Sequence, residues 1–174
     1  MEYTFTLKYQ LADDDYGSDV LVERLCEAGC DDALVGIGQP GRLALEFTRE
    51  ATDADEAVRS ALADVRRAAP SAQLIEVAPD LVGLTDVADI VGMSRQNMRK
   101  LMLAHPSSFP APVHAGSASI WHLADVLAWL QAKGSYALAK DVFDVARVAL
   151  LVNVAKEGQR LPRSASKALE TLVG

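Results

Sequence analysis

Hydrophobic and polar positions alternate along the first 80 residues in a regular order of short elements. Between Tyr3 and Tyr9 every second side chain is apolar, which is the pattern of a half-buried strand. The predicted elements are a strand at 3–9, a helix at 19–28, strands at 33–37 and 43–47, a helix at 53–69 and a strand at 74–77. This β-α-β-β-α-β order predicts a ferredoxin-like sandwich with both helices on one face of the sheet.

Residues 84–102, LTDVADIVGMSRQNMRKLM, predict two short helices separated by a sharp turn. Thr85 is placed to cap the first helix, and Ser94 is placed to cap the second, which ends near His105. Gly92 stands between them, where a tight turn needs either a positive φ or the absence of a side chain. The sequence leaves these two reasons for glycine open. The spacing is that of a helix-turn-helix.

The second of these helices divides into an apolar face and a polar face. Met98, Leu101 and Met102 share the inner face. The outer face carries Arg95, Gln96, Asn97, Arg99 and Lys100. In the major groove, Arg pairs with guanine, and Asn or Gln pairs with adenine, while Arg and Lys also bind phosphates. The helix therefore predicts contacts to double-stranded DNA, with Arg99 and Lys100 reaching the phosphates.

A short hairpin and further helices follow this pair. Residues 109–121 hold two extended segments around Gly116, which predicts a small wing, and residues 122–130 predict a helix packed back on the motif. Residues 137–156 predict a long helix and residues 164–172 a short one. Both flanks of the long helix are apolar, so it must pack on its own chain or on a second copy. The sequence leaves both partners open.

Together these motifs resemble a known family. Residues 81–132, with LTDVADIVGMSRQNMRKLM, FPAPV, a hairpin and WHLADVLAWL, are similar to the winged helix-turn-helix of the MerR superfamily, and most similar to AlpA-like and excisionase-like regulators of bacteria and phages. The resemblance implies that the second helix enters the major groove and that the wing lies near the adjacent backbone or minor groove. The residues expected to bind DNA are Ser94, Arg95, Gln96, Asn97, Arg99, Lys100, His114, Ser117 and Ser119. Relatives usually carry Arg or Lys in the wing, whereas this wing offers His114 and small residues.

Charge divides the chain as the patterns do. Residues 1–80 hold 17 acidic and seven basic side chains, net −10, while residues 81–133 hold three and four, net +1. Residues 134–174 hold four acidic and six basic side chains, net +2. The total of −7 therefore comes from the first half, which predicts two regions with different partners. The acidic residues of that half are scattered over loops and helix faces, so we expect a solvated surface there rather than a paired-carboxylate site.

The sequence offers little sign of catalysis, a cofactor or a membrane anchor. Residues 36–41 match the letters of a dinucleotide-binding G-x-G-x-x-G, but a strand follows, so a hairpin turn is expected. Cys26 and Cys30 lack neighbours that would complete a metal shell, and two cysteines suit a reducing cytoplasm. No set of nucleophile and base stands at useful spacing. No apolar run approaches the roughly 20 residues of a membrane span, and the N-terminus lacks a signal-peptide pattern.

These observations predict an α+β protein in three parts. We expect residues 1–79 to be a ferredoxin-like unit for dimerisation, partner or ligand binding, residues 80–133 a winged helix-turn-helix, and residues 134–174 a helical segment for packing or dimerisation. The predicted function is a cytoplasmic, homodimeric, sequence-specific DNA-binding regulator, a bacterial or phage repressor without catalytic activity, metal or cofactor. The alternative is an antitoxin-like or adaptor protein whose acidic first part binds a protein partner, with DNA binding only autoregulatory.

Overall fold

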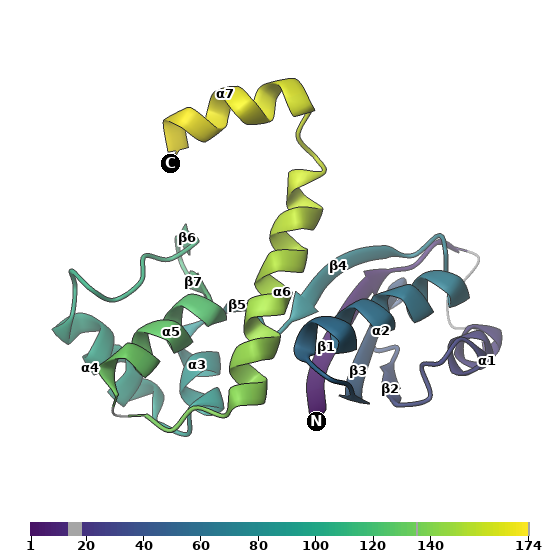
Figure 1. Ribbon diagram of the computed structural model, residues 1–174, viewed down its shortest axis with the longest axis horizontal. Coiled ribbons are helices and arrows are strands. Elements are labelled where there is room, and N and C mark those ends of the chain that lie inside the picture. Colours follow the sequence, from purple (N-terminus) through teal and green to yellow (C-terminus); the bar gives the residue numbers. More distant parts are fainter. Residues whose placement is uncertain (14–18, 135, 174) are drawn as a thin grey trace.

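The alternating residues of the N-terminus form an inner strand of an antiparallel sheet. The computed structural model describes residues 1–13, 19–134 and 136–173. Within this part of the chain, the strand order across the first sheet is β2 (Ala33–Gly36), β3 (Arg42–Glu50), β1 (Glu2–Gln10) and β4 (Gln73–Ala78) (Figure 1). The register of β1 on β3 sets Phe5 opposite Phe47, and their stacked ring centroids lie 5.3 Å apart. The fold class is α+β.

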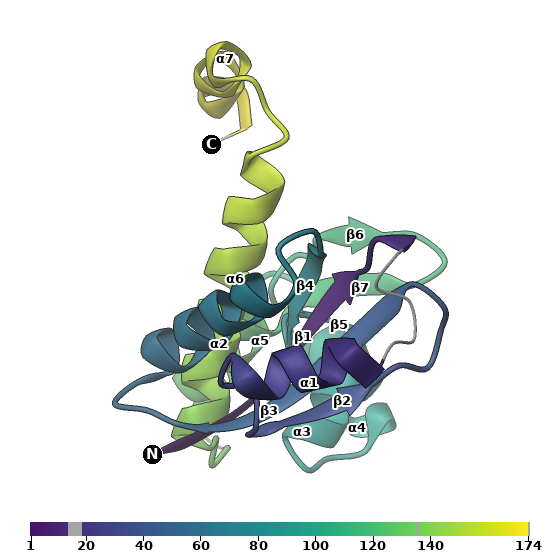
Figure 2. The same ribbon diagram turned by 90° about the vertical axis from the view of Figure 1, so that its right-hand side faces the viewer.

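Among the described residues, three helices cover one face of this sheet. They are α1 (Asp19–Glu27), α2 (Ala54–Ala68) and α6 (Lys140–Gly158). α2 packs against β1 and β3 beside α1, and α6 packs against α2, β1 and β4 (Figures 1 and 2). The alternate side chains of β1 and β3 that face these helices are buried, whereas Lys8 and Glu46 on the opposite face are exposed. The alternation thus supplies the first hydrophobic core.

The turns and helix ends that the sequence predicts are present in this half. The Asp53 carboxylate accepts a hydrogen bond from the Glu56 N–H at 2.8 Å and so caps α2. Gly29 follows α1 with a φ of +99°, a conformation that favours glycine. Residues 36–41 join the antiparallel strands β2 and β3, with Gly41 at φ +75°. The predicted hairpin at this position is confirmed.

The second half of the chain builds a smaller, mostly helical body. Its elements are β5 (Leu81–Val82), α3 (Leu84–Ile90), α4 (Arg95–Ala104), β6 (His114–Ala115), β7 (Ser119–His122) and α5 (Leu123–Lys133). β7 lies at the centre of a second antiparallel sheet, with β5 and β6 on either side. The sequence does not predict β5, because a two-residue strand has no period and exists only through its pairing with β7.

Helix α6 stands between the two halves and belongs to both hydrophobic cores (Figure 1). Val145 and Ala149 are buried in the first core, and Ala146, on the other flank, is buried in the second. α5 packs against this second flank. Both apolar flanks, whose partner the sequence leaves open, therefore pack on the helix's own chain, while Leu151 and Val154 near its end stay exposed. The helix begins at Lys140 rather than at the predicted residue 137.

A buried polar cluster ties α6 to both halves; we call Val77, Asp80, His122 and Asn153 the polar joint. The Asn153 amide accepts a hydrogen bond from the Val77 N–H and donates one to the Val77 carbonyl, both at 2.8 Å. Its nitrogen also donates to one Asp80 carboxylate oxygen at 2.7 Å. The other Asp80 oxygen lies 2.7 Å from the His122 Nδ1. Asp80 is only 1% exposed, so its carboxylate depends on these partners in place of water.

The polar joint also protects the outer edge of β4. Asn153 bonds both backbone groups of Val77 as a neighbouring strand would, and the Lys156 ammonium donates a hydrogen bond to the Ile75 carbonyl. Unpaired backbone groups along a strand edge invite pairing with another chain. Side chains of α6 therefore cover the edge of β4 that a second sheet would otherwise use.

The last helix, α7 (Arg163–Val173), follows a short connector after α6. Figures 1 and 2 both show it as an arm that stands away from the two halves. Across residues 1–13, 19–134 and 136–173, no helix combines the length and the apolarity needed to cross a membrane.

We predict that Asn153→Ala lowers the free energy of unfolding by about 3 kcal/mol, because buried groups of Val77 and Asp80 lose their partner. Urea unfolding of the variant and the parent measures the change. As a control, Asn97→Ala removes the same amide from the exposed face of α4 and should change the free energy of unfolding by less than about 0.5 kcal/mol. Equal unfolding midpoints for Asn153→Ala and the parent would contradict the role of the polar joint.

Candidate nucleic-acid interface

The turn between α3 and α4 depends on the backbone of Gly92. Its φ is +69°, and a Cβ added there would meet no atom within 4 Å. Of the two reasons for glycine that the sequence leaves open, the positive φ is therefore the one that applies. Ala88 of α3 and Met98 of α4 are both 0% exposed in the shared core. α4 is thus anchored by one face while its other face remains in solvent.

The first turn of α4 is capped as the sequence predicts. The Ser94 Oγ accepts a hydrogen bond from the Asn97 N–H at 3.2 Å. A serine hydroxyl that accepts in this way still has its own hydrogen to donate. Ser94 therefore orders the start of the helix and also offers a donor at the end where α4 begins.

The cap of α3 differs from the prediction of Thr85. The helix begins at Leu84 with Gly83 as its N-cap, two residues before the predicted cap, and Thr85 makes no capping hydrogen bond. Instead the Gly83 N–H donates to the Asp86 carboxylate at 2.8 Å. The pairing of β5 with β7 keeps the chain extended as far as Val82, so it turns into the helix before Thr85 is reached. The prediction was wrong because this pairing leaves no local pattern in the sequence.

The predicted polar face of α4 is exposed in the structure. The exposed side chains are Arg95, Gln96, Asn97, Arg99 and Lys100. At about 100° per residue, Gln96 and Lys100 both point about 160° away from the buried Met98. Arg95 and Arg99 lie on one flank of that outward line, and Asn97 lies on the other. Gln96 and Lys100 are therefore the most forward side chains of the helix.

No acidic side chain in the described part of the protein neutralises the basic groups on this face. Among the described residues, the side chains of Arg95, Arg99 and Lys100 take part in no hydrogen bond or ion pair. The helix itself contains no acidic residue. By contrast, Arg59 and Arg67 of α2 pair with aspartates at 2.7 and 2.6 Å. The α4 cations are therefore available to an external anion without the loss of an internal bond.

The predicted wing corresponds to the hairpin formed by β6 and β7. His114 and Ser117 are exposed, and Ser119 is half-buried. The strand register pairs His114 with Ile120 and Ala115 with Ser119. The hairpin contains no Arg or Lys, so it adds hydrogen-bonding groups without a permanent positive charge. The structure places the predicted wing residues together on this hairpin, apart from the set on α4.

An aromatic cluster orders the segment between α4 and the wing. Phe109 packs edge-on against Trp121 and Trp129, with ring centroids 6.0 and 5.1 Å apart. The Trp121 indole N–H donates a hydrogen bond to the Pro110 carbonyl at 3.0 Å. The FPAPV segment is therefore attached to β7 and α5. α4 and the wing are joined by an anchored segment rather than by a free loop.

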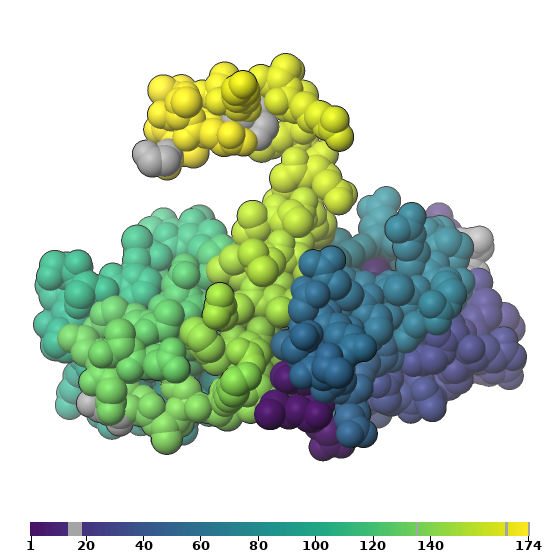
Figure 3. All heavy atoms as spheres, viewed as in Figure 1, coloured from purple at the N-terminus to yellow at the C-terminus, as the bar shows by residue number. Residues whose placement is uncertain are grey.

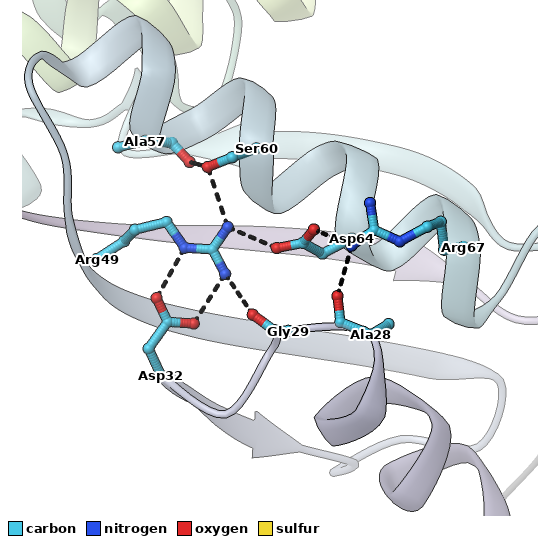
Figure 4. Close-up of polar contacts among 8 residues, drawn as sticks. All are labelled: Ala28, Gly29, Asp32, Arg49, Ala57, Ser60, Asp64 and Arg67. Atoms are coloured by element: carbon cyan, nitrogen blue, oxygen red, sulfur yellow. Dashed lines mark hydrogen bonds and ion pairs between the residues drawn. The ribbon is translucent and has the colours of Figure 1, made fainter.

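The first half holds a charged cluster that the sequence interpretation missed (Figure 4). The guanidinium of Arg49, which is 8% exposed, donates to both oxygens of Asp32 at 2.7 and 2.9 Å and to Asp64 at 2.8 Å. It also donates to the Gly29 carbonyl at 2.7 Å and to the Ser60 Oγ at 3.0 Å. The expectation of a solvated acidic surface is wrong for these two aspartates, because a buried cation organises them.

The alternation along β3 contains the signal for this cluster. Leu43, Leu45 and Phe47 point inward, and Arg49 is the next residue in the same phase. A cation that continues an inward-facing series must find acidic partners in the fold. Hydrogen bonds to Asp32 raise the pKa of the Arg49 guanidinium. The guanidinium therefore stays charged between the two carboxylates. The cluster stabilises the first half and engages the carboxylates of both Asp32 and Asp64.

The two cysteines differ in environment. Cys26 is exposed and Cys30 is buried, and both are free thiols. Burial, followed by the negative charge of Asp64, raises the pKa of the Cys30 thiol to about 11. Within the part of the chain that the structure describes, no group of three His, Cys, Asp or Glu side chains is arranged to hold a metal ion.

Comparisons with known proteins identify no family for this chain. No protein-family model matches the chain, and neither a curated protein nor a solved structure matches it.

We predict that Gly92→Ala lowers the free energy of unfolding by about 1 kcal/mol, because alanine is strained at a positive φ. Gly38→Ala is the matched control, since Gly38 has no positive φ and no neighbouring atom within 4 Å of an added Cβ. Thermal or urea unfolding compares the two variants. If Gly92→Ala is as stable as Gly38→Ala, the assigned reason for glycine at the turn is wrong.

We predict that one thiol per native chain reacts with a chromogenic disulfide reagent at pH 8, and that two react after unfolding. With a pKa of about 11, Cys30 is ionised only to about one part in a thousand at pH 8. Because the folded pKa is raised, the neutral thiol favours folding below about pH 8.5, and this contribution is lost as pH rises through about 11. Rapid labelling of both thiols in the native protein would contradict this assignment.

Proposed function

We propose that this protein is a sequence-specific DNA-binding regulator that acts as a dimeric repressor. In this proposal, residues 1–79 form a ferredoxin-like unit and residues 80–133 a winged helix-turn-helix of the MerR type. The strand order β2-β3-β1-β4, with its helices on one face, supports the first assignment. The succession of α3, a tight turn, α4, a hairpin and α5 supports the second.

The observation that carries the proposal is the uncommitted positive charge on α4. Arg95, Arg99 and Lys100 are exposed on one acid-free helix and hold no internal partner among the described residues. Nothing in the packing of this body requires three cations there. A phosphate backbone uses such charges directly, because each phosphate contact releases condensed counterions from the DNA. The neighbouring amides of Gln96 and Asn97 add the donors and acceptors that base reading needs.

The outward direction of each side chain suggests how the contacts are divided. Gln96 points straight out near the start of α4, so it reaches deepest into a major groove. Arg95 and Asn97 flank it on opposite sides and read the neighbouring bases. Arg99 and Lys100, one turn further, bind phosphates together with the Ser94 hydroxyl. Phosphate contacts set the register of α4, and base contacts set the sequence.

The acidic half is arranged to stay clear of the DNA. It lies on the other side of α6 from α4 (Figure 1), and residues 1–80 carry a net charge of −10. Repulsion by the phosphates turns this half away from the DNA and leaves the smaller body, which contains α4, against the duplex. Two copies bound to a palindromic site double the small set of contacts, and occupancy of that site blocks transcription.

We predict that duplexes selected from a random pool share a palindromic sequence, which Arg95→Ala/Gln96→Ala no longer selects. Each lost base contact should weaken binding about 10- to 100-fold, or about 1–3 kcal/mol. Fluorescence anisotropy at two salt concentrations measures this loss. Lys100→Ala should weaken binding to all sequences alike and reduce the salt slope by about 1 for each bound copy.

Arg66→Ala is the matched control, because it removes an exposed arginine from α2 in the acidic half. It should leave affinity and sequence preference unchanged. Binding without a shared sequence would replace sequence-specific regulation with architectural binding. Retention of no duplex at low salt would overturn DNA binding and favour the adaptor function, to be pursued with the acidic half as bait.

A further inference from the structure

An apolar groove lies between the sheet of β5, β6 and β7 and the C-terminal end of α6. Its volume is about 770 Å³. Four exposed apolar side chains from separate segments line it: Leu81 of β5, Val113 before the wing, Val154 of α6 and Leu161 of the connector. Their exposed fractions are 46–56%. Of its polar lining, Asp80, His122 and Asn153 are engaged in the polar joint, and Glu157 pairs with Arg160 at 3.1 Å. The groove therefore offers mainly apolar surface.

Helix α7 carries a matching apolar stripe that no other part of the described chain covers. At helical spacing, one side of the helix gathers Ala165, Ala168, Leu169, Leu172 and Val173. Leu169, Leu172 and Val173 are 45%, 79% and 81% exposed. The opposite side carries the basic residues Arg163 and Lys167. The space-filling view shows an open gap between α7 and the teal and green body below it, which holds α3, α4 and α5 (Figure 3).

The groove and the stripe together account for much of the apolar surface that the chain leaves in water. Of 14 large hydrophobic side chains exposed among the described residues, four line the groove and three lie on α7. Scattered single exposures are ordinary, whereas contiguous apolar patches mark interfaces. Two such patches in one chain, one concave and one helical, are suited to each other as a helix in a groove.

We propose that α7 of one copy docks into this groove of a second copy, and that the exchange is reciprocal. Leu161 itself lines the groove and Arg163 begins α7 two residues later, so the helix leaves its own groove at the rim and projects outward. Burying the seven side chains twice across a two-fold axis removes on the order of 1,400 Å² from water. That area lies within the range of about 1,200–2,000 Å² of a stable interface. The edge of β4, a competing surface, is closed by Asn153 and Lys156.

This exchange would be the dimer interface of the proposed repressor. Its biological role rests on the proposed function, but the contact itself does not. The contact itself requires no DNA. A mass measurement without DNA therefore tests the exchange, while duplex selection tests the function. A monomer that binds a half-site would overturn the exchange and the dimeric state, but not DNA recognition by α4. A dimer that binds no DNA would overturn DNA recognition and leave the exchange standing.

The test is light scattering after size exclusion at about 50 μM protein, without DNA. The parent should have twice the chain mass of 18.6 kDa. Leu169→Asp/Leu172→Asp on α7 and Val154→Asp in the groove should each give the mass of one chain, with circular dichroism unchanged. Val20→Asp, which places the same charge on an equally exposed site of α1, should remain dimeric.

Three results would overturn the exchange. A parent of single-chain mass means that α7 closes in its own chain or does not dock. Dissociation by the α7 variant but not by Val154→Asp means that α7 pairs with something other than the groove. Dissociation by Leu34→Asp, on the open face of the first sheet, with both other variants dimeric, means that the sheet makes the contact.

Discussion

The Asn153 amide fixes the position of α6 relative to the end of β4 and, through Asp80, relative to the end of β7. It bonds both backbone groups of Val77 at the end of β4 and one oxygen of Asp80, whose other oxygen meets His122 at the end of β7. Apolar burial brings α6 against both cores, but hydrophobic contact has no direction and leaves a helix free to slide. Directed hydrogen bonds inside the protein select one position. The position of the smaller body, which holds α3, α4 and α5, relative to the acidic half therefore depends on these hydrogen bonds.

The chain uses its positive charges in two different ways. In the first half, arginines form ion pairs within the chain. Arg49 binds two aspartates, and Arg59 and Arg67 each pair with an aspartate of α2. On α4, three cations face solvent with no internal partner in the described chain. A net charge of −7 alone argues against a polyanionic partner. The spatial division removes that objection, because α6 separates the acidic half from the basic helix (Figure 1).

Prediction from sequence succeeded where the determining interactions are local. The strands and helices of the first half follow from periodicity, and the caps at Asp53 and Ser94 follow from residue type next to a helix start. It failed for β5 and for the cap at Thr85, because both depend on pairing with β7, about 40 residues away. The Arg49 cluster was missed for a related reason: its aspartates come from separate loops and helices that only the sheet brings together.

The sequence by itself determined the periodicity of the strands, the glycine turn before α4 and the polar face of that helix. These features depend on side chains within one or two turns of each other. Only the tertiary structure decided that both flanks of α6 pack on its own chain, that Gly92 is needed for its φ, and that the apolar side of α7 has no cover within the described chain. Asn153 and Asp80 are 73 residues apart, and no local pattern connects them. Folding brings such groups together because a buried carboxylate must replace the water that it loses.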